Sequence, residues 1–116
     1  RLEAISAREA DNLVLTPVKS FDDAAVAVSN GTEFALPARA SLVTWQHYYT
    51  VDPTTVTVLI QLSVDGTIWD TGDTDSTAAG VIRTFETSAR FIRARISAQT
   101  GSGTEINVDI VTKAID

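Results

Sequence analysis

One histidine and a group of four aspartates are the side chains of this sequence best suited to acid–base or metal chemistry. His47 is the only histidine, and the aspartates are Asp65, Asp70, Asp73 and Asp75. A catalytic triad would place His47 beside an acid and a nucleophilic hydroxyl, but the chain contains no Gly-x-Ser-x-Gly elbow. We therefore expect no enzyme activity, and we interpret His47 as a packing or interface residue within a strand.

The aspartate group has an alternative use as a calcium site. Carboxylate oxygens suit Ca²⁺, which takes about six to eight oxygen ligands. The glycine-containing EF-hand spacing that ends in a glutamate is absent from this sequence. We interpret residues 70–79 as a solvated acidic loop, and we expect no metal and no cofactor.

Aromatic side chains gather on one predicted strand, residues 39–50. One face of that strand carries Trp45, His47 and Tyr49. Large aromatic residues contribute much of the contact energy at interfaces, so these three are candidates for partner binding. Two alternatives stay open, which are packing in the core and a platform for a sugar ring shared with other aromatic residues.

Basic side chains gather on a second predicted strand, residues 89–100. Its expected inner face carries alternating apolar residues, and its expected outer face carries Phe91, Arg93 and Arg95. These three are candidates for binding an acidic partner subunit. The alternative is neutralisation across neighbouring strands by Asp109 or Glu105.

Residues 1–11 are the segment most compatible with a helix, with Leu2 and Ile5 among interspersed charges. A segment of this length is marginal as an isolated helix. We expect an N-terminal arm or short helix, which is either a frayed terminus or an arm that docks on a neighbouring subunit through Leu2 and Ile5.

The elements that position these residues are strands. Residues 55–64 show the clearest alternation, which predicts a central strand whose inner face runs from Val56 to Val64. Asp65-Gly66 then turns the chain, and Trp69 is expected to cover the end of the core. Phe21-Asp22-Asp23 is a predicted turn. Asn30-Gly31 is a strong hairpin signal. The other expected strands are residues 12–20, 24–29, 32–36, 80–86 and 104–115.

These patterns predict an all-β fold, a single antiparallel β-sandwich or jelly roll of about seven or eight strands over residues 12–116. The net charge of −6 argues against nucleic acid as a partner, because phosphate contact needs a concentrated positive field. The sequence has no cysteine and no apolar run long enough to span a membrane, so we expect neither disulfides nor a membrane location.

Two motifs in the second half resemble known families. Residues 63–69 read Ser-Val-Asp-Gly-Thr-Ile-Trp, and residues 89–97 read Ala-Arg-Phe-Ile-Arg-Ala-Arg-Ile-Ser. They resemble a turn and a later strand of the discoidin-type, or galactose-binding-like, jelly roll. They also resemble the corresponding strands of small β-sandwich proteins of tailed bacteriophage particles, although Leu62 is displaced by one place and Phe91 stands where tyrosine is also found. The front half lacks the Trp-rich opening and paired cysteines of discoidin domains. The chain is also shorter than those domains usually are, so the phage proteins are the better match in size.

The phage resemblance implies a non-enzymatic structural protein of the virion, such as a capsid decoration (cementing) protein or a tail or baseplate component. Its implied partners are major capsid or tail subunits, and it is expected to be a homo-oligomer or to be bound within an assembly. The galactose-binding-like resemblance implies an alternative, a carbohydrate-binding or adhesion module with an extracellular location.

Overall fold

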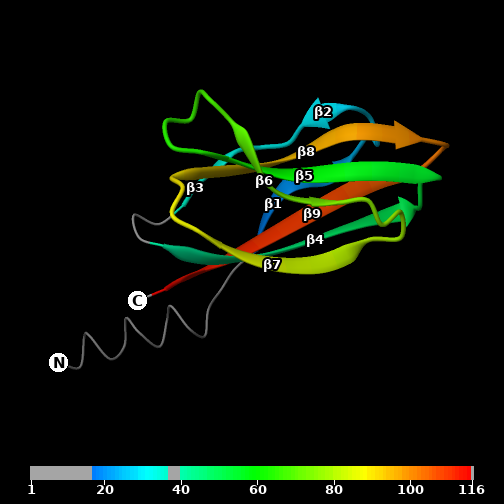
Figure 1. Ribbon diagram of the computed structural model, residues 1–116. Helices are drawn as coiled ribbons and strands as arrows, with labels where there is room; N and C mark the ends of the chain where they lie inside the picture. The colour runs from blue at the N-terminus through cyan, green and yellow to red at the C-terminus, as the bar shows by residue number, and fades with distance from the viewer. Residues whose placement is uncertain (1–16, 37–39, 116) are drawn as a thin grey trace.

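A computed structural model describes residues 17–36 and 40–115, and within these ranges the chain forms nine strands and no helix (Figure 1). The predicted arm with Leu2 and Ile5 lies outside the described residues. The strands are β1 (Val18–Ala24), β2 (Ser29–Asn30), β3 (Phe34–Ala35), β4 (Ser41–Val51), β5 (Thr55–Ser63), β6 (Asp70–Asp75), β7 (Val81–Thr87), β8 (Phe91–Thr100) and β9 (Thr104–Ala114).

The strands form two antiparallel sheets that pack face to face. Sheet A has the strand order β1-β9-β4-β7, and sheet B has the order β2-β8-β5-β6, with β3 also pairing with β8. Sheet B lies above sheet A in Figure 1. The edge strands β6 of sheet B and β7 of sheet A lie along the same edge of the sandwich. The fold is therefore the β-sandwich that the alternating pattern predicts.

The core lies between the two sheets and consists mainly of branched apolar side chains. It is built by alternate residues of the central strands, because successive side chains of a strand point to opposite faces. On β5 these are Val56, Val58 and Ile60, all 2% exposed or less. The other buried apolar residues are Phe21, Leu36, Val43, Trp45, Ile92, Ala94, Ile96, Ile106, Val108 and Ile110.

The strands with regular alternation are those that the sequence locates well. β4, β5, β7, β8 and β9 each begin and end within two residues of the predicted bounds. The inner faces predicted for β5 and β8 are confirmed except near their ends. Val64 is 79% exposed because β5 ends at Ser63, and Ala98 is exposed because the register between β5 and β8 shifts after Thr57.

The front of the domain differs from the prediction. Phe21-Asp22-Asp23 is not a turn, since β1 continues to Ala24 with irregular pairing to β9 and a positive φ at Asp23. Asn30-Gly31 does not join a hairpin. β2 and β3 pair with β8 instead of with each other, and the Gly31 N–H donates to the Ala94 carbonyl. Tertiary pairing with a long central strand therefore overrides the local turn signal.

The predicted loop at residues 70–79 is also wrong, because Asp70–Asp75 is the edge strand β6, paired with β5. Its residues are nearly all polar, so the apolar alternation that marks a strand is missing. Among the described residues there is no helix with the length and apolarity needed to cross a membrane.

Candidate interaction surface

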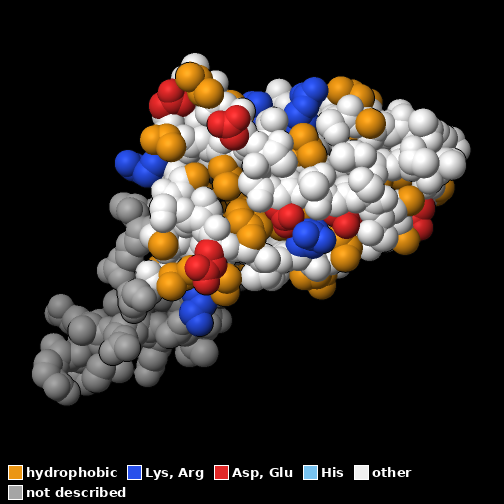
Figure 2. All heavy atoms as spheres, in the orientation of Figure 1, with side chains coloured by type: hydrophobic (Ala, Val, Ile, Leu, Met, Phe, Trp, Pro, Cys, Tyr) orange, Lys and Arg blue, Asp and Glu red, His pale blue; other side chains and the backbone are white. Residues whose placement is uncertain are grey.

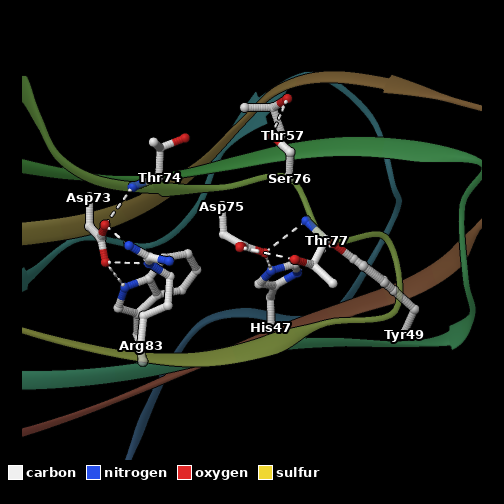
Figure 3. Close-up of polar contacts among 10 residues, drawn as sticks. His47, Tyr49, Thr57, Asp73, Thr74, Asp75, Ser76, Thr77 and Arg83 are labelled. Atoms are coloured by element: carbon white, nitrogen blue, oxygen red, sulfur yellow. Dashed lines mark hydrogen bonds and ion pairs between the residues drawn. The ribbon is translucent and has the colours of Figure 1, made fainter.

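A buried row of aromatic side chains on β4 meets two carboxylates of β6 across the sandwich. Trp45 and His47 are both 0% exposed, and their rings stack with centroids 5.6 Å apart. Asp73 and Asp75 point inward from β6 toward this row (Figure 3). We call these four residues, together with Tyr49, the buried polar ladder.

Asp73 links the two sheets by hydrogen bonds at the edge formed by β6 and β7. Its Oδ2 accepts a hydrogen bond of 2.9 Å from the Trp45 indole Nε1–H. The Arg83 Nε–H on β7 also donates to Asp73, with Nε–Oδ distances of 3.0 and 3.2 Å. Burial works to raise the pKa of Asp73, but the bonds from Arg83, Trp45 and the Thr74 N–H outweigh it and lower that pKa. Asp73 is therefore a satisfied carboxylate that ties β6 to β4 and β7.

Asp75 makes the corresponding connection to His47. The His47 Nε2 lies 2.6 Å from Asp75 Oδ2, and Thr77 donates to the same carboxylate through its N–H and its hydroxyl. Burial works to raise the pKa of Asp75, yet these hydrogen bonds lower it overall. An ionised carboxylate can only accept, so His47 Nε2 carries the proton.

The other His47 nitrogen is also occupied. Burial lowers the pKa of His47 more than the nearby Asp75 raises it, so the ring is neutral. Because Nε2 holds the proton, Nδ1 accepts a 2.8 Å hydrogen bond from the Tyr49 hydroxyl. Burial, followed by the charges of Asp75 and Asp52, raises the pKa of Tyr49, which keeps that hydroxyl protonated. Both ring nitrogens of His47 thus have partners inside the protein.

The buried polar ladder corrects the prediction that Trp45 and His47 bind a partner. Neither side chain reaches the surface, because the polar strand β6 covers this face of β4. Tyr49 is partly buried, and its ring packs against the core. Asp73 and Asp75 alternate in step with Trp45 and His47, but this match can be recognised only once β6 and β4 are known to face each other.

The strand pair β5–β8 carries the predicted basic face on the outside of sheet B. Phe91, Arg93 and Arg95 point outward and are each partly exposed, as their alternation with the buried Ile92, Ala94 and Ile96 predicts. They stand opposite Ser63, Gln61 and Leu59 of β5. We call the surface formed by these residues of β8, with Trp69, the arginine face.

Neutral groups hold the two arginines of this face. Arg93 donates from Nε to the Gln61 amide oxygen at 2.9 Å, and its guanidinium lies 4.3 Å from the centre of the Trp69 ring. Trp69 therefore lies beneath Arg93 on the outside of sheet B and does not cover the end of the core. Arg95 donates from Nη1 to the Asn30 amide oxygen at 2.7 Å.

The expected neutralisation of these arginines by Asp109 or Glu105 does not occur. Both acids belong to β9 in sheet A, and Asp109 pairs with Lys19 at 2.7 Å. Within residues 17–36 and 40–115, neither Arg93 nor Arg95 has a carboxylate within ion-pair distance.

The turn after β5 borders the arginine face. Asp65 Oδ1 accepts hydrogen bonds from the backbone N–H groups of Thr67 and Ile68 and from the Ser63 hydroxyl. The hydrogen bonds from the Ile68 and Thr67 N–H groups, and to a smaller extent the bond from the Ser63 hydroxyl, lower the pKa of Asp65. Gly66 provides the positive φ of 81° that the turn requires. The Ser-x-Asp-Gly motif thus builds a defined turn and leaves Ile68 70% exposed.

Comparison with known proteins identifies the fold of this chain. It is similar to three solved structures with a TM-score above 0.5, all between 15% and 17% identical in sequence. No protein-family model and no curated protein sequence matches the chain. At this level of identity the likeness concerns the fold alone.

Two of the three structures come from prophages. The SPBc2 prophage-derived protein YomS matches with a TM-score of 0.56 at 15% identity, over 85% of this chain and 93% of its own. The PBSX exported protein XepA matches with a TM-score of 0.60 at 17% identity, over 91% of this chain but only 39% of its own. The third is a Bacillus endospore appendage, a disulfide-linked pilus, with a TM-score of 0.52 at 15% identity over 89% of this chain and 88% of its own.

Proposed function

We propose that this chain is a non-enzymatic structural protein of a phage or prophage-derived particle, and that it binds neighbouring subunits as a capsid decoration or tail-associated protein. The observation that carries the proposal is the shared fold with a prophage-derived protein over nearly the full length of both chains. Two further neighbours, an exported prophage protein and a pilus subunit, support a role outside the cytoplasm in an assembly.

The strand connections support the same class of protein. Most successive strands lie in different sheets, so the chain crosses repeatedly between them. Among the described strands, β5 and β6 are the one pair that is both consecutive in the chain and hydrogen-bonded within a sheet. We infer from this order that the sandwich is a jelly roll, an architecture used in viral capsid and lectin domains.

The absence of an enzymatic role is supported by the position of His47. A general base must lie within hydrogen-bonding reach of the proton that it removes. His47 is fully buried, and its two nitrogens are bonded to Tyr49 and Asp75. A sugar platform is equally poorly supported, because Trp45 is interior and one face of Trp69 is covered by Arg93.

The proposal is tested on particles purified from the bacterium that carries this gene. Induced lysates are separated on a density gradient, and this chain is quantified against the major coat protein by mass spectrometry. We expect a fixed stoichiometry in the particle band, and antibody labelling in electron micrographs should locate the chain on the capsid or the tail.

The control is purified tagged chain added to a lysate that lacks the native protein, which measures adsorption after lysis. Recovery of the native chain only in the particle-free fractions would overturn the proposal, whereas saturable binding of the added chain at the native stoichiometry would support it.

A further inference from the structure

The arginine face carries positive charge that the described part of the chain leaves unneutralised. Arg93 and Arg95 occupy alternate positions of β8, so their Cα atoms are about 7 Å apart. The amide oxygens of Gln61 and Asn30 fix both guanidinium groups in place without cancelling their charge. Figure 2 shows basic side chains on the upper edge of the molecule, where β8 and β2 lie in Figure 1.

The opposite charge gathers at one end of the sandwich. The pairs Ala24↔Ile106 and Val51↔Thr104 bring the end of β1, the end of β4 and the start of β9 together. This end, which lies on the right in Figure 1, carries four carboxylates. They belong to Asp22, Asp23, Asp52 and Glu105. We call these four residues the acidic end.

One of these carboxylates, that of Asp23, is held by the neutral amide of Asn107, whose oxygen also accepts a hydrogen bond from Lys19 Nζ at 3.3 Å. The Asn107 side-chain amide donates to Asp23 Oδ1 at 2.8 Å, while the Asn107 oxygen accepts from the Asp23 N–H. Within residues 17–36 and 40–115, none of the four carboxylates has a cation within ion-pair distance. Val51, beside Asp52, is 51% exposed and adds apolar contact area.

We propose that the arginine face binds the acidic end of a second copy of this chain, so that copies associate head to tail. Two arginine faces would repel each other, as would two acidic ends, which disfavours a contact that pairs either surface with itself. A contact between two different surfaces closes into a ring or continues as a row. This inference rests on the proposed assembly function, because it identifies one of the neighbouring subunits.

Two charge-reversed proteins test the contact. Arg93→Glu/Arg95→Glu reverses the arginine face. Asp22→Lys/Asp52→Lys/Glu105→Lys reverses the acidic end, because only Asp23 then stays negative. Sedimentation velocity at about 20 mM salt should show oligomers of the native chain that dissociate at 1 M salt, where the screening length falls to about 3 Å. Each variant alone should lose at least about tenfold in its association constant, because both of its surfaces then carry the same sign of charge.

An equimolar mixture of the two variants provides the decisive result. Every contact between unlike variants pairs opposite charges, so mixing should restore association to near the native level. Lys113→Glu, which changes an exposed cation on sheet A, is the matched control and should leave association unchanged. Circular dichroism checks the fold of each protein, and Arg93→Gln/Arg95→Gln replaces the first variant if charge reversal unfolds it.

A native chain that stays monomeric at low salt would refute the head-to-tail contact, as would a mixture that associates no better than its components. A monomeric chain could still be recovered on purified particles, so the head-to-tail contact and the proposed particle function are refuted by different results. Binding of the arginine face to a sulfated polysaccharide, with the native chain monomeric, would also refute the proposal and would identify a polyanion as the occupant.

Discussion

Removing the Asp75 carboxylate should destabilise the domain more than removing the carboxylate of an exposed acid of the same strand. Asp75 accepts hydrogen bonds from His47 Nε2 and from both the N–H and the hydroxyl of Thr77. In Asp75→Ala the fully buried His47 Nε2–H loses its partner, and an unsatisfied buried donor costs about 1–3 kcal/mol. Loss of the local bonds to Thr77 adds about 1 kcal/mol, by analogy with side-chain caps of backbone N–H groups.

The expected total is about 3 kcal/mol of unfolding free energy. For a domain of this size that corresponds to a fall in melting temperature of about 12 °C, at about 4 °C per kcal/mol. Equilibrium urea unfolding and differential scanning calorimetry measure the two quantities. Asp70→Ala is the matched control, because Asp70 is exposed on the same strand, and it should change stability by less than about 0.5 kcal/mol.

A double-mutant cycle separates the His47–Asp75 contact from other effects of the substitution. His47→Ala and Asp75→Ala should show a coupling free energy of at least about 1 kcal/mol, because the two side chains share one hydrogen bond. If Asp75→Ala is no less stable than Asp70→Ala, or the coupling is below about 0.3 kcal/mol, the buried polar ladder does not stabilise this fold as argued.

Three further perturbations test other parts of the structure. The pKa of His47 is lowered in the folded state, so the unfolded chain binds a proton more readily than the folded chain. The free energy of unfolding should therefore fall as the pH drops below about 6.5, by at most about 1.4 kcal/mol per pH unit. Thermal melts from pH 7.5 to 5.5 should show a smaller fall in melting temperature for His47→Gln than for the native chain. Gly80→Ala should cost clearly more than Gly66→Ala in urea unfolding: both glycines have positive φ, which costs alanine about 1–2 kcal/mol, but a Cβ at Gly80 would also overlap the His47 carbonyl oxygen. Lys19→Ala should cost no more than about 1 kcal/mol, because its ion pair with Asp109 is solvated, and 1 M NaCl should reduce the difference from the native chain.

Regular alternation explains which strands the sequence locates. β5 and β8 have apolar residues at every second position, so their bounds and buried faces can be read directly. The same rule places Phe91, Arg93 and Arg95 on an outer face, as found. Alternation cannot say which face of β4 is interior, because both faces carry partly apolar residues. The sequence therefore left Trp45 and His47 open between a partner surface and the core, and the structure buries both.

β6 could not be predicted by the same rule, because its inward residues are carboxylates. Asp73 and Asp75 become favourable on an inner face only when the Trp45 indole and the His47 imidazole supply donors from the other sheet. Such a match depends on the packing of segments about 28 positions apart in the chain, as the two hydrogen bonds show. Local propensity contains no information about it, so a polar stretch of this kind reads as a loop.

Electrostatics separate the interior of this protein from its surface in a way that bears on assembly. Between the sheets, the carboxylates of Asp73 and Asp75 meet the ring donors of Trp45 and His47 within hydrogen-bonding distance, so these two charges have partners within one chain. For Arg93 and Arg95 on the arginine face and Asp23 at the acidic end, the hydrogen-bonding partners are neutral amides, which orient a charge without cancelling it. Oriented charges without an ion-pair partner cost little in water and favour an oppositely charged surface over a like one, which agrees with the assembly role proposed above.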